Sequence, residues 1–522
     1  MFLQLLLFVI VIAIYFVFHI LTKRHNYWKN RNVRYLKPSL IFGNYREYLL
    51  FKKYGPQVAG EICQKFPNEP YIGTFYGTEP ALLIQDPNLI KLILTTDAMY
   101  FSGRENTDYA HNEIITKNVF FTGGNEWKVL RQLLSPLFTT AKMKNMFPLI
   151  NECAKELDGY LDVEVKSTKN TMARSLLARY TMSTIISCVF GFNPNTLKSD
   201  VKEVNPFITI GARIFEPSIS NNLKVVCRSM WPYLFYQLGF KLFDDSIPFF
   251  FSNLFAESYR SRQKTGTTRN DLIDLFTELK KNNKYISSES YFASNNGEKE
   301  EIILPINDDL FSSTSLAFFG AGFDTTSNTV SFVLFELAKH KNAQDRVIEE
   351  VNTYFQRHNG QIGYECVNEL PYLEACINET LRLYPPVGIL TREVMADYVL
   401  PTGLHLKKGD RVHIPAHGLH RDPRYFPNPE EFRPERFLGE ERKKINPYVY
   451  MPFGLGARTC LGKRLAIMQL HPGFLTIFKK YKIELSENMP HTLSFRPIGL
   501  NIQPKTIIYL KFIERDNNGN GR

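Results

Sequence analysis

Residues 451–469 read Met-Pro-Phe-Gly-Leu-Gly-Ala-Arg-Thr-Cys-Leu-Gly-Lys-Arg-Leu-Ala-Ile-Met-Gln. Three glycines, at 454, 456 and 462, surround a single cysteine, Cys460, and let the backbone approach a flat ligand closely. After Gly462 the apolar residues recur at helical spacing, so the segment predicts a loop that enters a helix. The amide dipoles at such a helix start favour a thiolate, which makes Cys460 a candidate ligand. The ordinary alternative for a lone cysteine is a buried structural side chain.

The ordered set Phe453-Gly-x-Gly-x-Arg458-x-Cys460-x-Gly462 resembles the haem-binding loop of the cytochrome P450 family. The resemblance implies that the Cys460 thiolate is the axial ligand of the iron in haem b. It also implies that Phe453, Arg458 and Gly462 help to bind the cofactor. Ala457 stands where many members of the family carry proline, which removes no ligand.

Composition narrows the class of protein. The 522 residues include seven scattered cysteines and no Cys-x-x-Cys pair, which argues against a disulfide scaffold and a zinc site. An odd, unclustered cysteine count is typical of a reducing compartment. The net charge of +11 comes without a nucleic-acid motif, so we expect an anionic lipid surface or an acidic protein partner and no nucleic acid.

The N-terminus predicts a membrane anchor. Residues 2–21 read FLQLLLFVIVIAIYFVFHIL, about the 20 apolar residues that a helix needs to cross a bilayer. A cleaved signal peptide is the competing interpretation, but the run is too long and no small-x-small site follows. Basic residues follow at 23, 24, 29, 31, 34 and 37 and favour a cytosolic flank, while Trp28 and Tyr35 suit a membrane interface.

The resulting domain prediction has three parts: a transmembrane signal anchor (1–22), a basic linker (23–44) and a catalytic domain (45–522). The resemblance to microsomal members, which oxidise foreign compounds in insects and vertebrates, implies a single-pass protein of the endoplasmic reticulum membrane. Its catalytic domain then faces the cytosol.

A second motif lies well before the cysteine loop. Trp127 and Arg131 are spaced i and i+4, so they share one face of a helix. Without further context this would be a surface cation packed on a tryptophan. The resemblance implies instead that the pair contacts the haem propionates, with Arg104 and Arg392 as further propionate partners.

A long helical pattern runs from Asp308 to about residue 341 and contains Phe-Gly-Ala-Gly-Phe-Asp-Thr-Thr-Ser at 319–327. Glycines, an acid and hydroxyls are costly inside an apolar helix, unless they serve a contact between helices. The resemblance implies catalytic roles: Thr325 hydrogen-bonds dioxygen, and Asp324 relays protons through water. We expect the helix to be locally widened there to admit that water.

Glu379 and Arg382 share a helix face at i and i+3, a spacing that usually marks a solvated surface pair. Here apolar residues flank the pair and Pro385-Pro386 follows it. The resemblance implies that Glu379, Arg382 and Arg436 form one buried network, which holds the fold and takes no part in the chemistry.

The remaining pattern is mainly helical, and the expected fold is the mainly α cytochrome P450 fold with a small β-rich region. We expect two strands around a turn within 70–86, a long loop at 102–125 and helices through 150–280. The resemblance implies that 207–255, which is rich in apolar residues, forms the roof of the substrate cavity. We expect a polar, flexible surface loop at 281–303, and closing strands at 493–503 and 505–512.

The function that the resemblance implies is insertion of one oxygen atom of dioxygen into small apolar molecules. Electrons come from NADPH through NADPH-cytochrome P450 reductase, with cytochrome b5 as a second candidate donor. Two alternatives stay open: an isomerase or dehydratase that rearranges peroxides without a reductase, and a non-catalytic membrane haem or ligand carrier. Basic residues near the two haem-contacting motifs predict a docking face for the reductase: Lys128, Lys142, Lys144, Arg442, Lys443, Lys444, Lys463 and Arg464.

Overall fold

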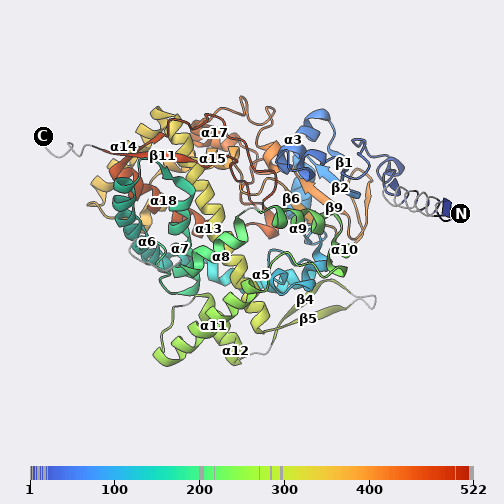
Figure 1. Cartoon of the computed structure of the whole chain (residues 1–522), viewed down its shortest axis with the longest axis horizontal. Coiled ribbons are helices and arrows are strands. Elements are labelled where there is room, and N and C mark those ends of the chain that lie inside the picture. The colour runs from blue at the N-terminus through green and yellow to red at the C-terminus, as the bar shows by residue number, and fades with distance from the viewer. Residues whose placement is uncertain are drawn as a thin grey trace.

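The computed structural model describes residues 22–198, 205–216, 218–269, 271–282, 285–293, 298–499 and 501–515, together with residues 2, 4, 5, 8, 12, 15 and 19. The predicted membrane anchor (1–22) therefore lies mostly outside the described residues. Within the described part of the chain, no helix combines the length and the apolar character that crossing a bilayer requires. The described chain is mainly helical with small sheets (Figure 1).

The α-helices have the following bounds: α2 (Arg46–Leu49), α3 (Gly55–Lys65), α4 (Pro87–Lys91), α5 (Gly124–Leu134), α6 (Thr140–Ser167), α7 (Ala173–Ile185), α8 (Pro206–Phe215), α9 (Ile219–Met230), α10 (Pro232–Gln237), α11 (Ser246–Thr265), α12 (Leu272–Asn282), α13 (Asp308–Lys339), α14 (Lys341–Arg357), α15 (Pro371–Leu383), α16 (Ala416–Leu419), α17 (Gly439–Lys444) and α18 (Lys463–Lys480). Short 3-10 turns are η1 (Lys29–Arg31), η3 (Thr107–Asn112), η4 (Ile114–Thr116), η5 (Ser135–Phe138), η7 (Tyr364–Val367), η8 (Pro434–Phe437) and η9 (Gly456–Arg458), and π turns are η2 (Leu92–Thr96) and η6 (Ile186–Phe190).

Helix α13 runs through the middle of the molecule and packs against α7, α11 and α15 (Figure 1). The Asn307 side chain caps its start by accepting a hydrogen bond from the Leu310 amide at 2.9 Å, and Asp308 and Asp309 complement the helix dipole. The predicted local widening is wrong, because α13 is α-helical throughout 308–339. The hydroxyl of Thr325 bonds back to the carbonyl of Ala321, one turn earlier, so the regular turn is kept.

A four-stranded sheet has the order β1-β2-β9-β6, with β1 (Tyr71–Tyr76), β2 (Glu79–Ile84), β6 (Leu390–Glu393) and β9 (Arg411–Ile414). The β1–β2 pair is antiparallel, with Tyr71 opposite Ile84, which confirms the two strands predicted within 70–86. Strands β10 (Tyr481–Leu485), β11 (Tyr509–Glu514) and β3 (Thr171–Met172) form a second sheet, and β7 (Tyr398–Val399) pairs with β8 (His405–Leu406).

The predicted flexible loop at 281–303 is wrong, because β4 (Tyr285–Ala293) and β5 (Lys299–Pro305) form an antiparallel hairpin there. The many serines and glutamates of the 281–303 segment indicated a loop. They lie instead on a strand, and one face of that strand packs against the protein. The predicted closing strand at 493–503 is also wrong: Phe495 makes only an isolated bridge to Pro504. The strand predicted at 505–512 is β11, shifted towards the C-terminus.

The segment predicted as a basic linker packs on the first sheet. Trp28 is only 1% exposed, lies against Gly73 and donates from its indole nitrogen to the Thr74 carbonyl at 2.9 Å. The Gly73 amide in turn donates to the Arg34 carbonyl at 2.8 Å. The expectation that Trp28 sits at a membrane interface is therefore wrong, because its ring fills a place in the protein core.

Candidate functional site

The cysteine loop keeps its shape through two glycines in the left-handed region. Gly454 and Gly456 both have φ of +68°, and a Cβ at Gly456 would lie 1.6 Å from the carbonyl oxygen of Leu94. Only glycine fits that approach between the loop and η2. The Cys460 amide donates to the Phe453 carbonyl at 2.9 Å, which closes the loop just before α18 begins at Lys463.

The Cys460 thiol is exposed, although protein surrounds it closely enough for desolvation to raise its pKa. The Gly462 amide and the positive charges of Arg131, Lys463 and Arg104 act in the opposite direction and do not outweigh burial. Desolvation in the folded chain therefore acts against the thiolate that the helix start favours, and a metal ion bound at the sulfur would favour it. Ala321 is also exposed, in the middle of the buried helix α13, as the wall of a ligand site would be.

Three arginines from separate segments, Arg104, Arg392 and Arg458, lie near one another. Burial lowers the pKa of Arg104 to about 10 and that of Arg392 to about 9. Burial and the charges of these two arginines also hold the pKa of Arg458 well below its usual range. Among the described residues none of the three forms an ion pair, and the Nε atom of Arg104 is buried without a hydrogen-bond partner. Such a cluster fits an anionic ligand, and the two propionates of haem b match it.

Helix α5 links this cluster to the cysteine loop. The Arg458 guanidinium lies 4.4 Å from the ring centroid of Trp127, and its Nε donates to the Ser102 carbonyl at 2.6 Å. Arg131 donates to the Thr459 carbonyl at 2.8 Å. The structure thus brings together Trp127, Arg131 and Arg458, which the sequence placed in two distant motifs.

Asp324 and Thr325 lie next to each other on α13 with different surroundings. The Thr325 hydroxyl donates to the Ala321 carbonyl at 2.6 Å. The Asp324 carboxylate is fully buried and pairs with Arg174 of α7, and it accepts a hydrogen bond from the Asn501 side-chain amide at 2.9 Å. Arg174 and Asn501 were not predicted, because they lie 150 and 177 residues away from Asp324 and belong to no local motif.

Glu379, Arg382 and Arg436 form one buried cluster. Arg382 donates to both carboxylate oxygens of Glu379 at 2.8 Å, and Arg436 approaches the same carboxylate at 3.4 Å. Arg382 also donates to the carbonyl of His420 at 2.8 Å. Burial lowers the pKa of His420 to about 3, so its neutral ring accepts a hydrogen bond from the Met451 amide at 3.0 Å. The cluster therefore supports the first residue of the cysteine segment.

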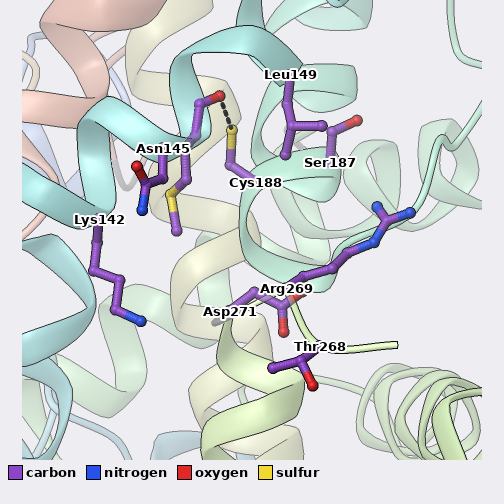
Figure 2. Close-up of a pocket in the computed structure, with 9 residues that line it drawn as sticks. Lys142, Asn145, Leu149, Ser187, Cys188, Thr268, Arg269 and Asp271 are labelled. Atoms are coloured by element: carbon purple, nitrogen blue, oxygen red, sulfur yellow. Dashed lines mark hydrogen bonds between the residues drawn. The ribbon is translucent and has the colours of Figure 1, made fainter. Parts of the chain in front are cut away.

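Two cavities lie outside this constellation. The larger, of about 670 Å³, is lined by α8, α9 and residues of the segments 242–247 and 498–503, and most of this lining belongs to 207–255, the expected roof of the substrate cavity. Phe215 on its wall packs edge-on against Phe323 of α13, with ring centroids 5.3 Å apart. The smaller cavity, of about 110 Å³, has Lys142 and Asn145 of α6 on one side and Arg269 on the other (Figure 2). It contains none of the predicted site residues.

Comparison with known proteins agrees with the geometry. The family model for cytochrome P450 matches residues 34–511. Cytochrome P450 6B2 of Helicoverpa armigera is 34% identical over 508 residues, which is 97% of each chain. Cytochrome P450 6B1 of Papilio polyxenes is 33% identical over 95% of this chain and 96% of its own, and cytochrome P450 6j1 of Blattella germanica is 32% identical over 95% of each. The chain therefore belongs to the cytochrome P450 family and is a haem-thiolate monooxygenase of that family.

Proposed function

We propose that this protein is a membrane-bound monooxygenase that oxidises small apolar molecules with NADPH electrons from a flavoprotein reductase. The observation that carries the site is the buried cluster of Arg104, Arg392 and Arg458, which lacks acidic partners in the described chain and stands beside the Cys460 thiol. When bound at this site, haem supplies the activation of dioxygen. The protein positions the haem and excludes water from the site.

The residues around the site then have separate tasks. Arg104, Arg392 and Arg458 hold the propionates, and Trp127 packs on Arg458. The Thr325 side chain is half-buried beside exposed Ala321, donates to its carbonyl, and keeps an oxygen that can accept a hydrogen bond from a bound ligand. Asp324 is held by Arg174 and Asn501, which fix the position of its carboxylate next to Thr325 for a role in proton relay.

We propose xenobiotics, plant toxins, insecticides or endogenous lipids and hormones as the class of substrate. Support comes from the apolar wall of the larger cavity, which includes Ile214, Phe215, Phe243 and Ile498, and from the insect origin of the relatives. The experiment that tests the function is a screen of apolar compounds by haem difference spectroscopy, followed by product analysis with NADPH and reductase. Products that form from peroxide substrates without NADPH would support the isomerase or dehydratase instead, and binding without turnover would support a carrier.

Replacing Thr325 with alanine should separate electron consumption from product formation. NADPH oxidation should continue in Thr325→Ala while the ratio of released peroxide to product rises about tenfold, since general acid–base positioning commonly contributes 10²–10⁴-fold. The matched control is Thr326→Ala, because Thr326 is the neighbouring buried hydroxyl and bonds the Gly322 carbonyl at 3.0 Å. An unchanged ratio in Thr325→Ala would show that protons arrive by another route.

Membrane attachment in the endoplasmic reticulum is part of the proposal. Residues 2–21 provide an apolar segment of spanning length. Large apolar side chains of α9, α10 and the turn that follows are exposed, Ile219 at 83% and the others at more than half: Leu223, Tyr233, Leu234, Leu238 and Phe240. Such a patch is suited to the apolar layer of a lipid surface.

A chain that begins at Lys23 should keep its haem. The truncation leaves Trp28 and its contacts on β1 in place, so the fold loses no described core residue. We expect the carbon-monoxide spectrum of the full chain, together with a membrane-bound fraction that resists high-salt washes because the apolar patch retains it, measured by sedimentation. Loss of haem in the shortened chain would mean that residues 2–21 belong to the core.

A further inference from the structure

The β4–β5 hairpin lies on helix α5 (Figure 1). The Lys128 ammonium donates to the Glu289 carbonyl at 2.7 Å, and the Tyr291 amide donates to the Asn125 side-chain oxygen at 2.7 Å. Lys128 also lies 5.0 Å from the centroid of the Tyr291 ring. Asn125 and Lys128 are spaced i and i+3, so the hairpin covers one continuous face of the helix.

The same helix serves the haem site with a neighbouring face. Trp127 packs on Arg458, and Arg131 bonds the carbonyl of Thr459, which precedes the cysteine. The hairpin therefore lies beside the haem-side face of α5, and burial raises the pKa of the Tyr291 hydroxyl while the charge of Arg458 acts to lower it. Phe292 of the hairpin extends the cover by packing against Tyr100, with ring centroids 5.0 Å apart.

The hairpin changes which of the predicted docking residues are free. Lys128 is engaged by the hairpin, and Arg442, Lys443 and Lys444 are paired with the glutamates 374, 440 and 441. Lys463 and Arg464, beside the cysteine loop, are exposed and have no acidic partner among the described residues. The face predicted to attract a partner is therefore partly occupied by the chain itself.

The hairpin carries the charge expected of that partner. The glutamates 289, 298, 300 and 301 are exposed and stand in no ion pair within the described residues, whereas Lys299 is the only basic side chain of the described hairpin. An acidic surface thus lies against a helix with a basic face. An acidic protein that approaches α5 would be repelled by these glutamates. Docking is therefore disfavoured while the hairpin remains packed on α5.

We propose that the β4–β5 hairpin is an autoinhibitory cover of α5, which an acidic electron-donating flavoprotein must displace before it docks on Lys128, Lys463 and Arg464. The inference rests on the proposed use of a reductase. Displacement breaks two hydrogen bonds, one cation–π contact, one aromatic contact and the interaction of Tyr291 with Arg458, and it exposes the half-buried rings of Tyr291 and Phe292. A partner's own contacts can offset so small a set, since each polar contact contributes little net stability when water replaces it. A partner that gains contacts with the uncovered lysine can therefore open the cover.

The first test removes two hairpin contacts that do not involve the haem-side arginines. In the double variant Asn125→Ala/Phe292→Ala, the reductase concentration that gives half-maximal haem reduction should fall about fivefold. Loss of the hydrogen bond from the Tyr291 amide to Asn125 and of the packing of Phe292 on Tyr100 shifts the cover towards its open state. The measurement is the rate at which NADPH and reductase produce the carbon-monoxide complex. Dithionite needs no docking and should give the same spectrum and amount in the variant and the parent. Tyr285→Ala is the matched control, because Tyr285 is an exposed tyrosine of the same hairpin.

The second test uses the unaltered protein. Hydrogen exchange of the amides in 285–293 and 299–305 should become faster when the flavin domain of a reductase is added at low salt. Two results would contradict the proposal that the hairpin is an inhibitory cover. One is a half-maximal reductase concentration that is unchanged or raised in the double variant, and the other is slower exchange of the hairpin amides when the flavin domain is added. If reductase and NADPH fail to reduce the parent protein while dithionite succeeds, the proposed electron source fails as well, and this outcome separates the two.

Discussion

The variant Cys460→His should bind haem without giving the long-wavelength Soret band of a thiolate-ligated, carbon-monoxide-bound haem. The band depends on the sulfur ligand, and a histidine nitrogen supplies a different axial donor. Cys460 is the cysteine that stands exposed beside Lys463 and within range of the charges of Arg104 and Arg131. The measurement is the difference spectrum of the reduced protein with and without carbon monoxide.

Cys227→Ser provides the matched control for that experiment. Cys227 is a partly exposed cysteine of α9 whose pKa is raised by burial alone, so its loss should leave the thiolate band at full height. A band that survives in Cys460→His, or disappears in Cys227→Ser, would contradict the assignment of Cys460 as the iron ligand. The parallel loss of NADPH-driven oxidation in Cys460→His follows from the loss of the thiolate, which promotes cleavage of the O–O bond.

The parts of the site that could be predicted from the sequence are motifs whose residues lie close together along the chain. The cysteine loop places its glycines and Cys460 within ten residues, and Trp127 and Arg131 share a helix face at i and i+4. The structure keeps both local arrangements and then brings them together, with Arg131 bonded to Thr459. The long helix around Thr325 was predictable for the same reason, since its apolar period runs through about 30 residues.

The parts that could not be predicted depend on tertiary contacts. Arg174 and Asn501 reach Asp324 from elements far away in the sequence, so no local pattern marks them. The pKa of Cys460 is set by desolvation in the folded chain, which outweighs the helix start that the sequence suggested. Trp28 is buried because β1 offers a glycine at 73 for its ring, a fit that composition cannot reveal.

Removing the carboxylate of Glu379 should destabilise the protein by ~3–5 kcal/mol, the usual cost of leaving a buried charge without its partner. Arg382 is fully buried and depends on both oxygens of Glu379, and Arg436 approaches the same carboxylate. In Glu379→Ala the Arg382 charge would remain in the core with only backbone carbonyls as partners. Because His420 bonds the Met451 amide behind this cluster, we expect the cysteine segment to loosen and haem to be lost during purification.

Glu374→Ala is the matched control, since Glu374 lies on the same helix α15 and pairs at 3.2 Å with the exposed Arg442. Such surface pairs contribute about 0–1 kcal/mol, so this variant should behave like the parent. The measurements are the haem content per protein and the urea midpoint of unfolding, followed by far-ultraviolet circular dichroism. A Glu379→Ala protein that keeps full haem and unfolds at the same urea concentration as Glu374→Ala would show that the cluster does not hold the fold. A Glu379→Gln protein separates charge from shape: the amide fills the same space, so a loss of haem in that variant as well would assign the effect to the missing negative charge opposite Arg382.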